Sequence, residues 1–142
     1  MTRRIPFSAV SPELADRYLA KGRGFQRDAA QMATLAGDFS GNGIAVLCVH
    51  AAIAYADALA VRAVGRKSKS GDHGDAADFL VGAIPIRAAE DKKALKAFKA
   101  VLSRKDEVSY ADDIIEELDA QVIMGRLSVF AAWAERRYSA LR

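Results

Sequence analysis

"IAVLCVHAAIAYADALAV", residues 44–61, is the stretch most informative about the fold, because it is apolar on nearly every side of a helix. The stretch is long enough for a membrane span, but His50 and Asp57 interrupt it and much of the rest is alanine. An aspartate near the centre of a bilayer costs about 2.5–3.5 kcal/mol on insertion scales. We therefore expect a buried helix over about residues 44–64, at the middle of a soluble bundle or between a core and a second subunit. The protein is expected to be cytoplasmic, without a membrane partner.

The composition of the whole chain also favours helices. Its 142 residues suit a single domain, 1–142, and we expect the first ~10 residues to be extended or flexible. Only three prolines occur, and the abundant alanine loses no side-chain entropy on entering a helix. The net charge of +3 is compatible with a nucleic-acid partner without requiring one. A single cysteine, Cys48, excludes an internal disulfide, and its apolar neighbours favour a small buried side chain.

The segment before the central stretch predicts a first helix, with Ser11 as its cap and Pro12 as its first residue. Gly22 and Gly24 weaken this helix, so a kink or break would fall there. Small or apolar residues recur in alternating steps of four and three, which marks one packing face: Tyr18, Gly22, Phe25, Ala29, Met32, Ala36 and Phe39.

Two helices are predicted directly after the central one, which Gly65 ends. A short helix covers about residues 75–83, with Asp72 as its cap. An amphipathic helix follows over residues 89–102. Its apolar stripe consists of Leu95, Phe98, Val101 and Leu102.

The last helix is predicted from about Ser109 to the C-terminus. Its apolar residues at heptad spacing are Ile115, Leu118, Val122, Gly125, Val129 and Ala132, and the stripe is widened by Ile123, Leu127, Phe130 and Trp133. No alternating strand pattern is long enough to compete with these helices. The predicted fold is all-α, an antiparallel up-and-down four-helix bundle with an additional short helix.

The stretch "GRKSKSGDHGD", residues 65–75, has the composition of a binding site. It is not a phosphate-binding P-loop, because an acidic residue, Asp72, stands where that motif needs its lysine and no strand is predicted before it. We expect a solvated connection between two helices.

His50 and Asp57 are polar groups on an otherwise apolar helix, seven residues apart and therefore on one face. One interpretation is that each finds a hydrogen-bond partner across the bundle, for example His73, Arg104 or Tyr110. The other is that both lie at the floor of a polar pocket at the bundle or dimer interface. The spacing of the histidines and carboxylates does not match a metal site, and we expect no metal and no cofactor.

The densest basic patch lies on the predicted helix 89–102. Its four lysines are Lys92, Lys93, Lys96 and Lys99. They could follow a phosphate backbone, but a charged outer face is the ordinary outcome for a surface helix, and no aromatic residues interleave with them to stack bases.

The order of these elements, with "VHAAIAYADALAVRAVGRKSKSGDH" (49–73) and "VLSRKDEVSY" (101–110), resembles the HEPN family of small helical-bundle proteins. The resemblance implies a helical bundle that is a metal-independent ribonuclease, an inactive dimeric scaffold or an RNA-binding module. Many of the ribonucleases are toxins paired with a small nucleotidyltransferase. Their motif is an arginine followed, after four to six residues, by a histidine at the start of the last helix.

The matching arginine here is Arg104, but Tyr110 stands where the histidine would. Tyrosine, with a pKa of about 10, is a poor general base at neutral pH. Arg66 and His73 have the right spacing but lie in the turn after the central helix.

The sequence therefore predicts a non-enzymatic HEPN-like interaction module that forms a homodimer, as one half of a toxin–antitoxin or nucleotidyltransferase-linked pair. The homodimer is expected because the second and last helices carry more apolar surface than one core covers. The alternative is an RNA-cleaving or RNA-binding HEPN protein, an endoribonuclease if it is an enzyme. It would use Arg104 with Tyr110, or Arg66 with His73.

Overall fold

The computed structural model describes residues 4–35, 40–70, 72–105, 112 and 114–141. Within these ranges the chain is mostly helical, which confirms the all-α prediction. The elements follow in the order β1 (Phe7–Ala9), the 3-10 turn η1 (Pro12–Leu14), α1 (Ala15–Met32), α2 (Gly41–Val64), β2 (Arg66–Ser68), α3 (His73–Ala83), α4 (Ala89–Leu102) and α6 (Glu117–Ala140).

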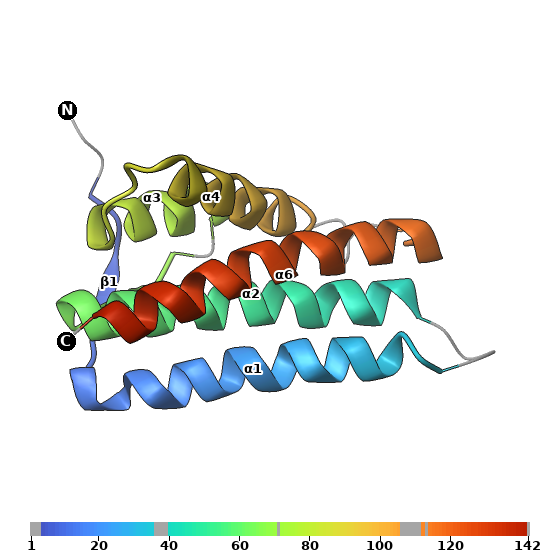
Figure 1. The fold of residues 1–142 in the computed structure, drawn as a ribbon, viewed down its shortest axis with the longest axis horizontal. Coiled ribbons are helices and arrows are strands. Elements are labelled where there is room, and N and C mark those ends of the chain that lie inside the picture. The colour runs from blue at the N-terminus through green and yellow to red at the C-terminus, as the bar shows by residue number, and fades with distance from the viewer. Residues whose placement is uncertain (1–3, 36–39, 71, 106–111, 113, 142) are drawn as a thin grey trace.

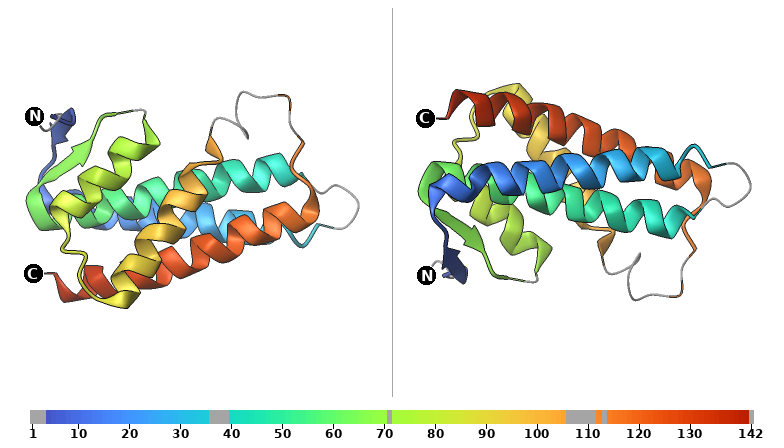
Figure 2. Two further views of the ribbon diagram at one scale, coloured as in Figure 1. Left: turned by 90° about the horizontal axis from the view of Figure 1, so that it is seen from above. Right: turned by 90° about the horizontal axis from the view of Figure 1, so that it is seen from below.

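The three longest helices lie side by side along the molecule, and α2 is in the middle (Figure 1). α1 runs in the direction opposite to α2 and α6. Seen from above, α4 crosses obliquely over α6 and α2, and α3 lies beside it (Figure 2). This arrangement covers α2 from several sides at once.

α2 is the core of the protein. Fourteen of its residues are buried, and half of these are alanines, which let the neighbouring helices approach closely. Ser40 caps the helix by accepting a hydrogen bond from the Gly43 amide (3.1 Å), so the helix begins three residues before the predicted Ile44. Its end is as predicted, with Gly65 in the left-handed region at φ 65°.

By length and composition α2 could also cross a membrane, and it is the one described helix that passes this test. In the fold, 72% of its most apolar window is buried inside the protein. The helix therefore has the burial of a core helix, as its sequence predicted.

α1 is continuous through Gly22 and Gly24, without the break that the glycines could have caused. Gly22 is buried against α2, and a Cβ built on it would lie 3.0 Å from the ring of Tyr55. The absence of a side chain there lets α1 pack closely on α2. The start differs from the prediction, because Pro12 opens a 3-10 turn, Ser11 makes no side-chain cap and α1 begins at Ala15.

The two short strands were not predicted. β1 and β2 pair antiparallel, with Phe7 opposite Ser68 and Ala9 opposite Arg66. Each strand has only three residues, which is too short for an alternating pattern to be visible in the sequence. The pairing fixes β1 onto the turn that follows α2.

α4 has the predicted bounds, and Phe98, Val101 and Leu102 are buried as expected. α6 begins at Glu117 rather than near Ser109; residues 106–111 and 113 lie outside the described residues. The core face of α6 is formed by the residues expected only to widen its stripe: Ile123, Leu127, Phe130 and Trp133.

The heptad stripe predicted for α6 as its packing face is mostly exposed. Ile115 is buried, but Leu118, Val122 and Val129 are 75%, 49% and 37% exposed, and Gly125 and Ala132 are also exposed. The prediction was wrong because α6 has two apolar faces, and α2 and α4 cover only one of them. The exposed face is a surface with no partner inside the described chain.

Candidate functional site

A small cavity lies between α2, the β2–α3 turn and α4. Its volume is about 50 Å³, room for no more than a few water molecules. The wall is mainly apolar, with Phe79, Leu80 and Phe98 among the larger side chains. Its polar lining residues are Asp57, Ser68, Ser70, Asp72 and Lys105.

Asp57, in the wall of this cavity, has a strongly shifted pKa. Burial raises the pKa of its carboxyl group to about 6, and the positive charges of Lys67 and Lys21 offset the rise in part. A carboxyl group that titrates near neutral pH in a cavity is a candidate proton donor or acceptor. The size of the cavity limits what could reach it.

The turn over residues 65–75 is built by its own side chains. The Ser70 hydroxyl donates to the Asp75 carboxylate (2.8 Å) and accepts from the Asp72 amide (3.1 Å). Asp72 accepts from the Asp75 amide (3.0 Å) and so caps α3, as predicted. The stretch is therefore more than the solvated connection we expected, since it contains β2 and contributes part of the cavity wall.

The structure separates His50 and Asp57, which one of the two interpretations placed in a shared polar pocket. Asp57 lines the cavity, whereas His50 is exposed and its ring lies 5.6 Å from that of Phe25 on α1. The two residues are on one face of α2, but His50 is not part of the cavity wall.

The two arginines of the nuclease hypothesis lie in different settings. Arg104 follows α4 and is half-buried, with its guanidinium 3.8 Å from the Asp119 carboxylate at the start of α6. Tyr110 lies outside the described residues. Arg66 is in β2, with its guanidinium 4.6 Å from the centre of the Phe7 ring. His73 is the first residue of α3, and its side chain is also outside the description.

A larger hollow lies on the surface between α4 and α6, with a volume of about 360 Å³. We call it the α4/α6 groove and define it by its eight lining residues: Lys93, Lys96, Ala97, Ala100, Val122, Gly125, Arg126 and Val129. Lys92 and Lys99, the other two lysines of the predicted basic patch, are exposed on α4 outside the groove. The groove thus joins part of the basic patch to the exposed stripe of α6.

A buried carboxylate fixes the position of α4 on α6. Asp91, only 4% exposed, accepts a hydrogen bond from the Trp133 indole N–H (2.9 Å). It also accepts from the amides of Arg87 (3.1 Å) and Ala88 (3.0 Å). These bonds, the indole bond first, lower the pKa of Asp91 to about 2. Asp91 was not singled out from the sequence. An acidic residue at the third position of a helix is a local signal for the two capping bonds, but not for the bond from Trp133.

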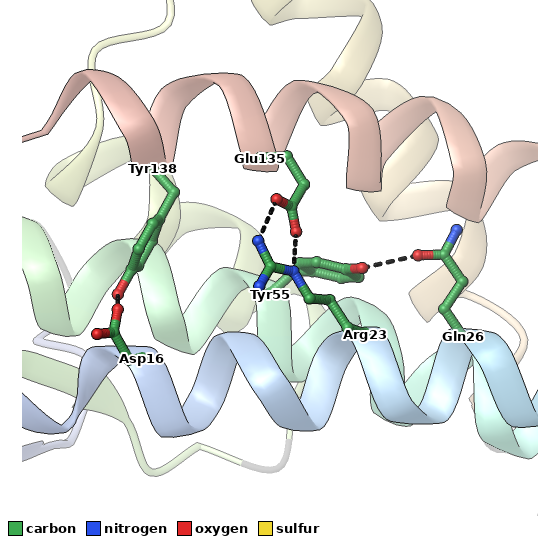
Figure 3. Close-up of polar contacts among 6 residues, drawn as sticks. All are labelled: Asp16, Arg23, Gln26, Tyr55, Glu135 and Tyr138. Carbon is green, nitrogen blue, oxygen red and sulfur yellow. Dashed lines mark hydrogen bonds and ion pairs between the residues drawn. The ribbon is translucent and has the colours of Figure 1, made fainter.

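A second set of polar contacts ties α6 to α1 and passes in front of α2 in the view of Figure 3. Arg23 makes a two-pronged ion pair with Glu135, with both N···O distances 2.6 Å. Tyr138 donates a hydrogen bond to Asp16. With Asp91 on the other side, these contacts fix the rotation of α6 and leave its second apolar face outward.

Comparison with protein-family models, with curated proteins and with solved structures gives no match to this chain. Among the described residues, no group of three His, Cys, Asp or Glu side chains is placed to hold a metal ion. The cavity beside Asp57 and the α4/α6 groove are the two candidate sites in the described residues.

Replacement of Asp57 by Asn is expected to stabilise the protein at neutral pH. The pKa of Asp57 is about 6 in the folded protein, which is above its value in the unfolded chain. Protonation of Asp57 therefore stabilises the fold; this stabilisation is complete below about pH 4 and is lost as the pH rises through 6. Urea unfolding near pH 7.5 should show a gain of about 1–2 kcal/mol that disappears near pH 4.

Asp78→Asn, at an exposed position of α3, is the control and should change stability by less than about 0.5 kcal/mol at either pH. A loss of stability in Asp57→Asn near pH 7.5 would show instead that the Asp57 carboxylate is held by Lys67 or Lys21.

Proposed function

We propose that this chain is a HEPN-like helical interaction module, with a four-helix bundle at its core, that binds another protein through the α4/α6 groove. The observation that carries the proposal is the exposed aliphatic face of α6. Leu118, Val122 and Val129 are exposed on one side of the helix, and the last two line a groove of about 360 Å³. Contiguous apolar surface of this kind on a soluble protein is typical of a binding site.

The rest of the geometry favours binding over catalysis. The cavity beside Asp57 is small, about 50 Å³, and Arg104 is engaged with Asp119 across the junction of α4 and α6. An ion pair at that place supports the fold, which gives Arg104 a structural role. We propose that the module works as one half of a pair, in the manner of the toxin–antitoxin or nucleotidyltransferase-linked HEPN proteins.

The homodimer stays a prediction. The sequence based it on uncovered apolar surface of both α2 and α6, and the structure leaves such a face on α6. The surplus apolar surface of α2 is covered by α1, α3, α4 and α6 of the same chain. Of the apolar surface that the two helices carry, the exposed face of α6 is the part that we propose for a partner, whether a second copy or another protein.

Site-specific photo-crosslinking in the cells that make the protein tests this function. Benzoylphenylalanine at Val129, in the groove, is expected to give one defined crosslinked product, because a bound partner must lie within reach of that side chain. The same residue at Ala30, exposed on α1, should give none.

Gly125→Trp should abolish the product from position 129, since a built Cβ at Gly125 points into open space and the indole would fill the groove. No product from position 129, or equal products from both positions, would contradict the proposal.

RNA binding is the second candidate, and the exposure of Lys92, Lys93, Lys96 and Lys99 along α4 favours it. If α4 follows a phosphate backbone, RNA affinity should fall steeply with salt, and Lys92→Glu with Lys96→Glu and Lys99→Glu should flatten the slope by roughly 0.7 per lost contact. Binding measured over a series of salt concentrations gives the slope. An unchanged slope in the triple variant rules this candidate out.

A further inference from the structure

We infer that the α4/α6 groove takes an amphipathic helix with an apolar face and acidic edges, contributed by a partner protein. This inference rests on the proposed function and names the chemistry of the partner. It follows from three features of the groove: its charge, its shape and its lack of self-complementarity.

The charge of the groove has one sign. Its eight lining residues include three cations and no acid. Lys93 and Lys96 come from α4 and Arg126 from α6, so the cations stand on both sides of an apolar floor. No ion pair of these three side chains occurs among the residues that the structure describes. A partner with carboxylates along its edges would supply the missing countercharges.

The shape of the groove suits a rod. Ala97 and Ala100 on α4, and Val122 and Val129 on α6, form a floor that follows the line between the two helices. Gly125 lies between the two valines, and a Cβ built on it meets nothing within 4 Å. The floor is therefore low at its centre. A helix that presents apolar residues at i, i+4 and i+7 fits a floor of this form.

A second copy of the chain is a poorer occupant of this groove. In a two-fold dimer the same patch contacts itself, so Lys93, Lys96 and Arg126 would approach the same cations of the other copy. Like charges across an interface oppose binding. No acidic residue is part of the groove lining to pair with these cations, and Asp119 of α6 is already close to Arg104.

RNA is also a poorer occupant. The floor is made of alanine, valine and glycine, and none of the lining residues is aromatic. Binding of single-stranded nucleic acid relies on aromatic platforms beside the cations. An aliphatic floor matches the apolar face of a helix better than it matches bases.

Fluorescence anisotropy with designed peptides and the full chain tests the inference. The first probe is a labelled helical peptide of about fifteen residues, with leucines at i, i+4 and i+7 and glutamates on both flanks. The second keeps the leucines and replaces every glutamate by lysine. The acidic peptide should bind saturably, more weakly as salt rises, and at least about tenfold more tightly than the basic one.

Matched variants locate the binding site. Lys93→Glu with Lys96→Glu, both in the groove, should weaken binding of the acidic peptide by about tenfold or more. Lys92→Glu with Lys99→Glu makes the same charge change on the same helix outside the groove and should have little effect. Gly125→Leu fills the groove without a change of charge and should also weaken binding. Circular dichroism and thermal unfolding verify that all variants fold.

The outcomes separate this inference from the proposed function. Equal binding of the acidic and basic peptides, or equal effects of the two double variants, overturns the acidic partner. The acidic partner is also overturned if the acidic peptide does not bind while position 129 still gives a crosslinked product. If that product has twice the mass of the chain, the occupant is a second copy. Loss of both peptide binding and the crosslink overturns the proposed function as well.

Discussion

The burial of α2 is the constraint from which the packing of the other helices follows. This helix is apolar on nearly every side, so it must be covered from several directions in water. Its alanines and the contact of Gly22 with Tyr55 bring α1 close on one side, and α6 covers another side while α3 and α4 complete the cover. The most extensive contacts with α2 are those of α1 and α6.

The burial of α2 leaves one apolar face of α6 uncovered. The helix has one apolar face around Leu127 and Phe130 and a second around Val122 and Val129, and the core takes only the first. Polar contacts on both sides of α6 then fix which of its two apolar faces is buried. On one side Trp133 donates to the buried Asp91 of α4, and on the other Glu135 pairs with Arg23 of α1 (Figure 3). Rotation of α6 by one residue, about 100°, would break both contacts and leave Asp91 buried without its indole partner, which is costly.

Much of this fold could be predicted from the sequence, because hydrophobic spacing and capping are local signals. The bounds of α4, the end of α2 at Gly65 and the Asp72 cap of α3 all follow from them. The orientation of α6 does not, since a helix with two apolar faces gives the same spacing whichever face is buried. The hydrogen bond between Asp91 and Trp133 joins residues far apart in sequence, so no local pattern could reveal it. For the same reason the sequence indicated that Asp57 is an unusual group, but not that His50 lies outside its cavity.

The most direct test of the account is the reactivity of single cysteines on the two faces of α6. The native Cys48 is buried, and burial raises the pKa of its thiol to about 12, so it should react only after unfolding. Val129→Cys should react with a thiol reagent in the folded protein at nearly the rate of a free thiol, whereas Ile123→Cys should react only when the protein unfolds. The reverse pattern, a protected thiol at position 129 and a reactive one at 123, would contradict the account, because the groove would then not exist.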